Sequence, residues 1–396
     1  MNILVLHNNY PAQFKFLLPS LVACNHNVVF LSLESHGNKI PGVKHYKVGA
    51  SDKNTYNSWN IPYKGLGKKL EYAEIFRAAF QKLRDSGFYP DLTIFHSGWG
   101  IGCFLKSVFP KTRSFAYAEW WFNWDSVEAK YDSASEYSPS SSLIDKVSQH
   151  YLNLTQASEI AEADFVWSPT HWQRHQFPKS IQKRMEIIHE GVDTSLFAPL
   201  NQAFDINKPI HITYTSRALE PMRCYNHFYK IIAPVMQAYT SINLTIVGKS
   251  KAVYRPTSSK TSLYEESLKY FEKHNLTDRI RHYDRLDISQ YSKLLCNSQI
   301  HFYFSRPFVA SWSLLEAMSS GCSIISNETP MTSEFLKHKK NAFLVDSTDV
   351  QKSVDDIKDH LNNQSSVDAM AANARAFSLN FDYRKQLKLL KSFIGY

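Results

Sequence analysis

The sequence has no Cys-x-x-Cys pair, although it contains five cysteines among 396 residues. The cysteines are odd in number and far apart, at positions 24, 103, 224, 296 and 322. This spacing predicts neither a zinc site nor a disulfide framework. Most of the cysteines lie within apolar runs and are expected to be buried free thiols. Free thiols favour a reducing compartment, so we expect a cytoplasmic protein.

The sequence also has no apolar run that approaches the ~20 residues of a membrane-spanning helix. The first residues, Met1–His7, read as a β-strand and lack the charged start and longer apolar core of a signal peptide. Any membrane contact is therefore expected to be peripheral. The last residues, Tyr383–Tyr396, have lysines on one side and aliphatic residues on another. This basic amphipathic helix either packs on the protein or lies at an anionic membrane surface.

Charge and composition narrow the classes of partner and fold. Lys and Arg (45) exceed Asp and Glu (36), which gives a net charge of +9. This balance favours an anionic partner such as a phosphorylated small molecule, an acidic membrane surface or nucleic acid. Nucleic acid ranks last, because no RNA-binding signature or basic heptad helix is present. The chain is 43% hydrophobic, so it can form large cores, and its length suits two domains.

Short β-rich runs alternate with helical patterns along the chain. The expected strands are Ile3–His7, Asn27–Leu33, Leu92–His96, Arg113–Ala118, Phe165–Ser168 and Met185–His189, then Ile210–Thr215, Asn243–Val247, Ile280–Tyr283, Ile300–Phe304, Ser323–Ser326 and Ala342–Val345. The expected helices include Phe14–Ala23, Lys68–Ser86, Ser148–Glu162, Tyr225–Tyr239, Ser262–His274 and Gln351–Asn362. This alternation predicts an α/β protein built from βαβ units with parallel sheets.

The β/α pattern restarts near residue 208, after a polar stretch that contains two prolines. We therefore predict two Rossmann-like domains, residues 1–197 and 208–380, with a hinge near 195–208. The C-terminal helix, residues 381–396, is expected to pack back on the first domain. Residues 125–142 are rich in Ser, Tyr, Asp and Glu with little periodicity, which is typical of a long functional loop.

Ligands bind open α/β sheets at the carboxyl ends of the strands, so the residues after each strand are the first candidates. Arg217 and Arg223 follow the strand at 210–215, shortly before a helix. Arginine forks bind phosphate oxygens, and a helix N-terminus adds amide donors. The two arginines are thus candidates for a phosphate site. The alternative is that both form ordinary surface salt bridges.

The segment after the strand at 300–304 is the second candidate. Ser311 is a plausible N-cap for a helix, and Trp312 and Ser313 form its first turn. Their amides and hydroxyls suit a second phosphate. Glu316 follows about one turn later among apolar neighbours, and its carboxylate can accept hydrogen bonds from the vicinal hydroxyls of a ribose. The alternative is a solvent-facing glutamate. Gly321 is expected to end this helix.

Two further candidates lie in the first half. His96 ends a strand beside the Gly-rich turn Ser97–Gly100, where it can bind a substrate hydroxyl or phosphate. Glu119 follows another strand among aromatic residues, a setting that suits a sugar. The alternatives are a structural histidine and core aromatics. The turn after the first strand, His7–Phe14, is not a GxGxxG loop, so dinucleotide binding there is poorly supported.

These residues together resemble the family 4 glycosyltransferases of the GT-B fold. His189–Phe197 is similar to the family's N-G-V-D-x-x-x-F segment, and Glu316-Ala317-Met318 with Gly321 is similar to its E-A-M-A-x-G core. His96–Gly100 resembles the H-x-G-W-G of one bacterial surface-glycan subgroup. The resemblance implies an N-terminal acceptor domain and a C-terminal nucleotide-sugar domain, with sheets facing across a cleft.

The resemblance also implies roles for the candidates. Arg217 and Arg223 hold the donor diphosphate together with Ser311, Trp312 and Ser313, and Glu316 binds the ribose. His96 and Glu119 are the catalytic candidates, with Glu119 as an acceptor contact. One departure is Phe308, which stands where the family usually has a second glutamate that contacts the donor sugar. No metal and no cofactor is expected, because arginines and helix dipoles stabilise the leaving diphosphate.

The function implied is a retaining hexosyltransferase in surface polysaccharide synthesis, such as capsule or lipopolysaccharide. It would use a nucleotide sugar, with UDP favoured over GDP, and a glycan or lipid-linked saccharide acceptor. Residues 119–142 favour an acceptor pocket. The alternatives are a GT-B nucleotide-sugar epimerase and a non-catalytic nucleotide-sugar-binding subunit. The expected location is the cytoplasm, with possible peripheral contact at the inner face of an anionic membrane.

Overall fold

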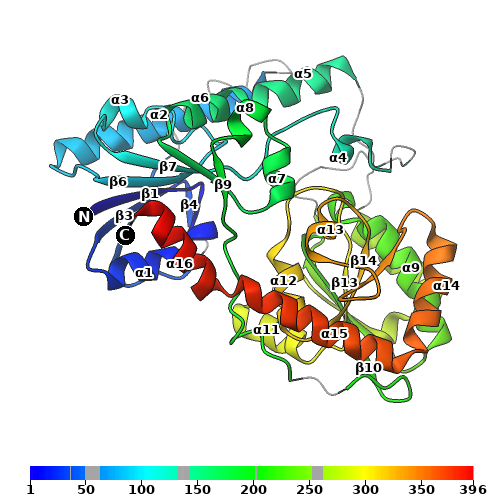
Figure 1. Ribbon diagram of the computed structural model, residues 1–396. Helices are drawn as coiled ribbons and strands as arrows, with labels where there is room; N and C mark the ends of the chain where they lie inside the picture. Colours follow the sequence, from blue (N-terminus) through cyan, green and yellow to red (C-terminus); the bar gives the residue numbers. More distant parts are fainter. Residues whose placement is uncertain are drawn as a thin grey trace. The chain divides into compact units, whose positions relative to one another are not determined.

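The computed structural model describes residues 1–35, 37–49, 63–132, 135, 137, 142–200, 203–251 and 262–395. The chain divides into two compact units (Figure 1). The first comprises Met1–Ala129, Pro139–Glu190 and Gln386–Tyr396, and the second comprises Lys130–Ser138 and Gly191–Lys385. The expected loop at 125–142 includes 133–134, 136 and 138–141, which lie outside the described residues.

The first unit contains a seven-stranded sheet in which all neighbouring strands are parallel. In spatial order the strands are β5 (Val43–Lys47), β3 (Asn27–Ser32), β1 (Asn2–Leu6), β6 (Leu92–His96), β7 (Arg113–Tyr117), β8 (Phe165–Ser168) and β9 (Met185–Ile187). Leu6 pairs with Phe95, and His96 pairs with Tyr117. This register brings the residues that follow β1, β6 and β7 to the same edge of the sheet.

Helices cover both faces of this sheet because its central strands are apolar on both sides. Apolar side chains of α1 (Leu17–Ala23) and α16 (Tyr383–Ile394) pack on one face, and those of α2 (Lys64–Asp85), α3 (Leu105–Val108) and α6 (Leu154–Glu162) pack on the other. The remaining elements are η1 (Ala12–Phe14), β2 (Asn9–Tyr10), β4 (Glu34–Ser35), α4 (Val127–Lys130), α5 (Leu143–Leu152), α7 (His171–His175) and α8 (Lys179–Gln182).

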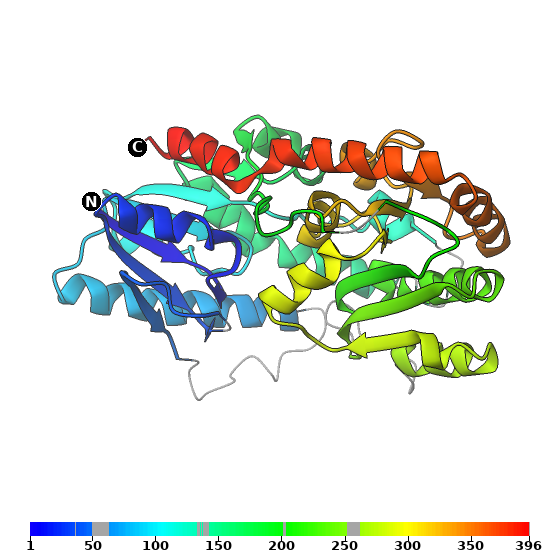
Figure 2. The same cartoon turned by 90° about the horizontal axis from the view of Figure 1, so that it is seen from below.

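The second unit contains a six-stranded parallel sheet. Its order is β12 (Ile280–Tyr283), β11 (Ile242–Lys249), β10 (Ile210–Ala218), β13 (Ile300–Tyr303), β14 (Ser323–Asn327) and β15 (Phe343–Val345). Its helices are η2 (Pro221–Arg223), α9 (Tyr225–Ala238), α10 (Leu263–Lys273), η3 (Thr277–Arg279), α11 (Ile288–Cys296), α12 (Trp312–Ser319), α13 (Thr332–Phe335), α14 (Val350–Leu361), α15 (Gln364–Ser378) and η4 (Leu379–Phe381). Figures 1 and 2 show helices on both sides of this sheet.

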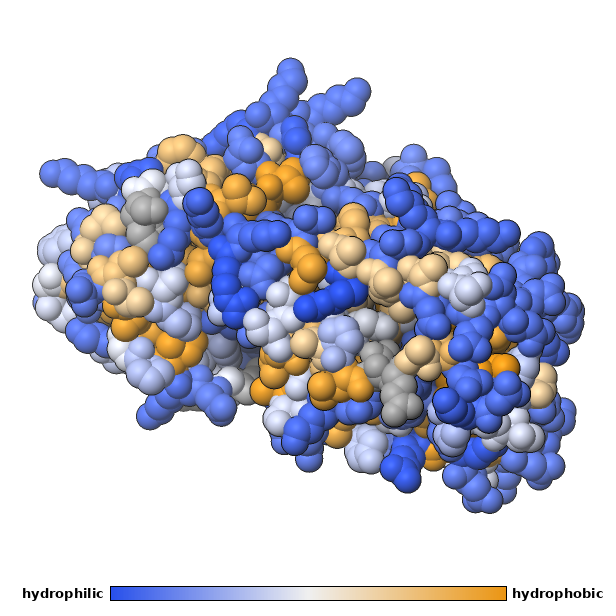
Figure 3. Space-filling view, turned by 60° about the horizontal axis from the view of Figure 1, so that its bottom comes forward, coloured by the Kyte–Doolittle hydropathy of each residue, from blue (hydrophilic) through white to orange (hydrophobic). Residues whose placement is uncertain are grey.

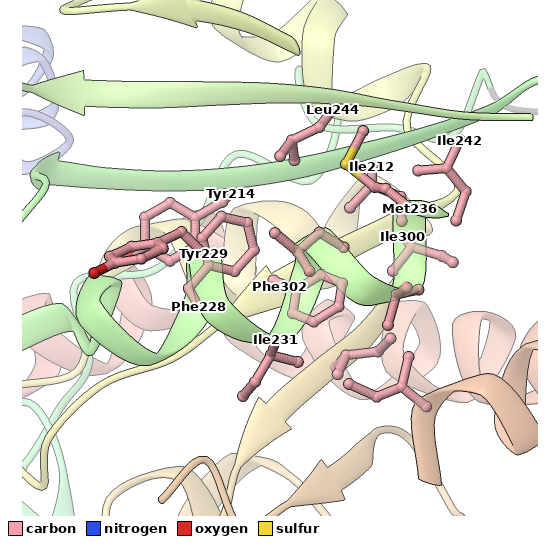
Figure 4. Close-up of a cluster of buried hydrophobic side chains, with 14 of the residues drawn as sticks. Ile212, Tyr214, Phe228, Tyr229, Ile231, Met236, Ile242, Leu244, Ile300 and Phe302 are labelled. Atoms are coloured by element: carbon pink, nitrogen blue, oxygen red, sulfur yellow. The ribbon is translucent and has the colours of Figure 1, made fainter. Parts of the chain in front are cut away.

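An aromatic cluster forms the core between α9 and the second sheet (Figure 4). The ring of Tyr214 on β10 stacks on Phe228 of α9 with centroids 4.3 Å apart, and Phe302 of β13 meets Phe228 edge-on at 5.4 Å. Met236 and Ile231 extend the cluster along the same helix. Because fully buried apolar side chains contribute roughly 1.5–3 kcal/mol each, this cluster fixes α9, and with it η2, against the sheet.

The α/β architecture with two parallel sheets is confirmed, but its units differ in detail from the expected domains. The first unit ends at Glu190 and also includes Gln386–Tyr396, whose apolar residues pack under its sheet. Lys130–Ser138 belongs to the second unit, where the Tyr131 hydroxyl is 3.1 Å from Ser347 Oγ. Strand β5 was not predicted, because it is an edge strand with exposed polar residues.

Among the described residues, no helix has both the length and the apolar character that crossing a membrane requires. The face of the protein shown in Figure 3 is mainly hydrophilic, and its apolar residues are interspersed among polar ones.

The second unit contains two buried histidines, and we therefore expect the free energy of unfolding to fall in mild acid. Burial lowers the pKa of His301 to about 3 and that of His360 to about 4. In the unfolded chain both titrate near pH 6.5. Because the unfolded state then binds more protons below pH 6.5, the stabilisation present above that pH is lost as the pH falls toward 4.

We expect each of these histidines to reduce the free energy of unfolding by about 2 kcal/mol between pH 7 and pH 5. Urea unfolding at the two pH values measures the change. His360→Gln should show a smaller pH dependence than the wild type, and the exposed His175→Gln should not differ from the wild type. Equal pH dependence in all three proteins would contradict the prediction.

Candidate active site

In the second unit, the candidate phosphate ligands lie at the carboxyl ends of two neighbouring strands. Tyr214 of β10 pairs with Phe302 of β13, so the segments after these strands share one edge of the sheet. β10 is longer than expected and runs to Ala218, so Arg217 is part of the strand and is exposed. Arg223 ends η2 and is only 6% exposed. Arg223 is therefore a buried cation, whereas Arg217 faces solvent.

Arg223 is held against the loop that precedes α12. Its Nη1 atom donates hydrogen bonds to Ser305 Oγ at 2.8 Å and to the Val309 carbonyl at 3.2 Å. The Tyr214 hydroxyl donates to the Arg223 carbonyl at 2.7 Å. These contacts fix a guanidinium charge beside the residues that lead into α12. The alternative of a surface salt bridge is therefore wrong for Arg223.

Helix α12 begins as the sequence predicts. The Ser311 side chain caps the helix by accepting a hydrogen bond from the Ser313 amide, and the Ser311 amide donates to the Tyr303 hydroxyl at 3.0 Å. At the other end Gly321 has a positive φ of 80°, which glycine adopts without strain. Trp312 and Ser313 form the first turn, so their amides lie at the positive end of the helix dipole.

Glu316 lies on α12 and is 7% exposed, so the alternative of a solvent-facing glutamate is wrong. Burial raises the pKa of Tyr291 on α11 well above its usual value, and the charge of the nearby Glu316 carboxylate raises it further. Tyr291 was not among the predicted site residues. No sequence signal marks it, because its proximity to Glu316 depends on the packing of α11 beside α12.

In the first unit, the structure brings His96 and Glu119 together. His96 is 5% exposed, and its Nδ1 atom is 2.7 Å from the Ser97 carbonyl. A carbonyl only accepts hydrogen bonds, so Nδ1 carries a proton. His96 Nε2 is 3.4 Å from Glu119 Oε2, and Glu119 Oε1 accepts a hydrogen bond from Gln13 at 3.0 Å. The pair therefore places an imidazole nitrogen beside a carboxylate, two groups that can form hydrogen bonds with a sugar hydroxyl.

The turn after His96 is held by a buried carboxylate that the sequence analysis missed. Glu159 on α6 is 1% exposed and accepts hydrogen bonds from the Gly98 amide at 2.6 Å and the Gly102 amide at 2.8 Å. Burial raises the pKa of Glu159, while the two amides and Lys69 oppose the shift. The sequence offered one signal for Glu159: it is a charged residue within a helix that is expected to pack on the sheet. Glu159 thus fixes the peptide between Ser97 and Gly98, whose carbonyl accepts the hydrogen bond from His96.

A second buried histidine lies beside His96. The His7 ring is edge-on to the His96 ring with centroids 4.9 Å apart, because His7 follows β1, the neighbour of β6. His7 Nδ1 accepts a hydrogen bond from the Asn9 amide at 2.8 Å. Burial and the proximity of His96 lower the pKa of His7 well below 6.5. His7 is therefore neutral at physiological pH and adds no charge near His96.

Phe308, the departure from the family pattern, lies half-buried in the loop between β13 and α12. Its amide donates to the Arg306 carbonyl at 2.7 Å. Arg306 is 2% exposed, and its guanidinium lies 5.3 Å from the Tyr131 ring centroid and donates a hydrogen bond to the Tyr131 carbonyl. Sequence reasoning missed both Arg306 and Tyr131, since Tyr131 is remote in the chain. This loop therefore carries a second buried cation rather than a carboxylate.

No group of three or more His, Cys, Asp or Glu side chains with the arrangement of a metal site occurs within the part of the chain that the structure describes.

Two family models match the chain in succession. The model of the glycosyl transferase family 4 group matches residues 24–197, and the model of the glycosyl transferases group 1 matches residues 200–377. The chain belongs to the family 4 glycosyltransferases. As a family 4 glycosyltransferase it is an enzyme of the hexosyltransferase type. A comparison with curated proteins finds no match.

Solved structures of other proteins share the fold of this glycosyltransferase. The sucrose-phosphate synthase of Thermosynechococcus elongatus has a TM-score of 0.72 at 13% identity, with 99% of this chain and 98% of that chain covered. HepE of Anabaena, in complex with UDP and glucose, has a TM-score of 0.68 at 14% identity, covering 100% and 99%. WaaG, a glycosyltransferase involved in lipopolysaccharide biosynthesis, has a TM-score of 0.68 at 12% identity, covering 99% of both chains. The predicted GT-B fold is confirmed.

Proposed function

We propose that this enzyme transfers a sugar, with retention of configuration, from a UDP-sugar to a hydroxyl of a glycan or glycolipid acceptor in surface polysaccharide synthesis. The observation that carries the proposal is the buried Arg223, which is fixed beside the N-terminus of α12, the helix that also carries Glu316. HepE has been solved with UDP-glucose, and WaaG acts in lipopolysaccharide biosynthesis. Both support the choice of donor and pathway.

On the donor side of the reaction, the main requirement is to stabilise the negative charge of the leaving diphosphate. Departure of the nucleoside diphosphate builds negative charge on the phosphate oxygens, and Arg217 and Arg223 stabilise it with charge-assisted hydrogen bonds. The first-turn amides at Ser311, Trp312 and Ser313 add donors at a helix N-terminus. Glu316 accepts hydrogen bonds from the ribose hydroxyls. This scheme uses no metal and no cofactor.

The acceptor side uses His96 and Glu119. His96 Nε2 and the Glu119 carboxylate can form hydrogen bonds with sugar hydroxyls, and Glu119 is oriented for this by Gln13. In a retaining transfer on one face of the sugar, the leaving phosphate takes the proton of the acceptor hydroxyl. A dedicated base is then not needed, and the role of His96 is to hold the sugar in the reactive geometry.

Calorimetric titration with UDP tests the proposal. We expect the wild type to bind UDP, and Arg217→Ala to raise the Kd about tenfold, since a hydrogen bond to a charged group contributes roughly 1.5–3 kcal/mol and Arg217 is exposed. Arg77→Ala, which removes an arginine paired with Glu74 on α2, is the control and should bind UDP like the wild type. Unchanged affinity in Arg217→Ala would contradict its assignment to the phosphates.

A further inference from the structure

The segment Lys130–Ser138 belongs to the second unit and places the side chain of Tyr131 against the core of that unit. The Tyr131 hydroxyl accepts a hydrogen bond from Asn327 Nδ2 at 2.8 Å and is 3.1 Å from Ser347 Oγ. The Arg306 guanidinium lies 5.3 Å from the centroid of its ring and donates to its carbonyl. The hydroxyl, the ring and the carbonyl of Tyr131 therefore all have partners in the second unit.

Asn327 carries this contact to the loop that precedes α12. Its side chain is fully buried. The Asn327 Nδ2 atom also donates to the Ser305 carbonyl at 2.9 Å, and Oδ1 accepts a hydrogen bond from the Ser305 amide at 2.9 Å. An asparagine amide has two N–H donors, and here one meets Tyr131 and the other meets Ser305. The orientation of the Asn327 amide is therefore fixed between the phenol and the backbone of the loop.

Ser305 completes the link to the candidate phosphate ligand. Its hydroxyl has a single proton, which it donates to the Arg306 carbonyl at 2.8 Å. The same oxygen accepts the hydrogen bond from Arg223 Nη1 at 2.8 Å. Ser305 is fully buried and Arg223 nearly so, which leaves little room for either side chain to move. An unbroken chain of hydrogen bonds thus joins the phenol of Tyr131 to the guanidinium of Arg223.

The next residue anchors the same segment at a second point. Asp132 Oδ2 is 3.0 Å from His227 Nε2 on α9. His227 Nδ1 is in turn 3.3 Å from Ser347 Oγ, the group beside the Tyr131 hydroxyl. These contacts form a closed ring that begins and ends at neighbouring residues of the segment. The position of the Tyr131 phenol is therefore fixed from both sides.

We propose that Tyr131 is a positioning residue that, through the buried amide of Asn327, holds the Arg223 guanidinium in the orientation that binds the donor diphosphate. The inference rests on the proposed function, since it requires Arg223 to bind phosphate. Without the phenol oxygen, one N–H of the Asn327 amide loses its acceptor, and a buried donor without a partner is costly. The amide then turns toward another acceptor and releases the backbone of Ser305, so the guanidinium is less well aligned with the phosphates.

Calorimetric titration of the full chain with UDP tests the role of Tyr131. We expect Tyr131→Phe, which keeps the ring, to raise the Kd about fivefold, the scale of one hydrogen bond. The same substitution in the Arg223→Ala background should change the Kd less than about twofold, because the group that Tyr131 positions is then absent. Tyr239→Phe is the matched control, because its phenol bonds the Lys358 carbonyl at 3.1 Å and Asn362 at 3.0 Å in another part of the unit. It should bind UDP like the wild type.

Ser305→Ala provides a second variant, which removes the hydroxyl that accepts from Arg223. It should also weaken UDP binding, and it should have little effect once Arg223 is absent. Unchanged affinity in either Tyr131→Phe or Ser305→Ala would overturn the positioning role and leave the proposed function standing. An equal loss with and without Arg223 would show that Tyr131 is merely structural and would overturn the role as well. A wild type that does not bind UDP, or an Arg223→Ala variant that binds it like the wild type, would overturn the proposed function, and the inference with it.

Discussion

Replacement of Arg223 by alanine is expected to raise the Kd for UDP about 100-fold, the upper end of the range for a buried charge-assisted contact. The effect exceeds that of Arg217→Ala because Arg223 is 6% exposed, so its charge is less screened by water. The variant should also unfold at a lower temperature, since Ser305 Oγ and the Val309 carbonyl lose their donor. Calorimetry with UDP and a thermal melt measure the two effects.

A structural arginine in the same unit separates these two effects. Arg279 donates hydrogen bonds to three backbone carbonyls, those of Met236, Tyr239 and Ile242. Arg279→Ala should therefore lower the melting temperature without changing the affinity of the folded protein for UDP. If Arg223→Ala behaves in the same way, Arg223 supports the loop alone and does not contact phosphate.

The second large effect is expected for His96→Ala, which should lower the rate of sugar transfer about 100-fold while the Kd for UDP stays within about twofold. His96 is fixed by the Ser97 carbonyl and faces Glu119. Neither contact involves the residues of the second unit that are candidates for binding the nucleotide. Release of UDP from a UDP-sugar in the presence of an acceptor measures the rate, and calorimetry measures UDP binding.

His45→Ala is the matched control for this variant. His45 belongs to the same sheet, stacks on Tyr10 with centroids 4.0 Å apart and contacts Ser32 at 2.8 Å. Its loss should affect stability but not the rate per folded molecule. Parallel losses of UDP binding and transfer in His96→Ala would show that His96 is structural.

The fold was predictable because it depends on local patterns repeated along the chain. Strands such as Asn2–Leu6 and Ile300–Tyr303 are short, apolar and buried on both faces, which is typical of parallel sheets. The start and end of α12 were also predictable. A serine N-cap and a glycine with positive φ act within a few residues of themselves, so their chemistry is visible in the sequence.

The contacts that shape the candidate site were not predictable in this way. Glu159 lies far along the chain from the glycine amides that it binds, and Tyr131 is remote from Arg306. Such contacts arise from tertiary packing, so no local sequence pattern predicts them. The sequence placed His96, Glu119 and Arg223 at strand ends, and the structure adds what orients them. Their roles in binding and catalysis stay predictions.

The path of the chain has a consequence for experiments on separate halves of the enzyme. A cut after Glu190 gives an N-terminal fragment without Gln386–Tyr396 and a C-terminal fragment without Lys130–Ser138. The first fragment then exposes the apolar surface that Leu387, Leu390 and Ile394 cover. The second loses Asp132, whose carboxylate is 3.0 Å from His227 Nε2. An isolated second unit would therefore need the 130–138 peptide grafted onto it, and an isolated first unit would need Gln386–Tyr396 fused back, for either to fold as it does in the whole chain.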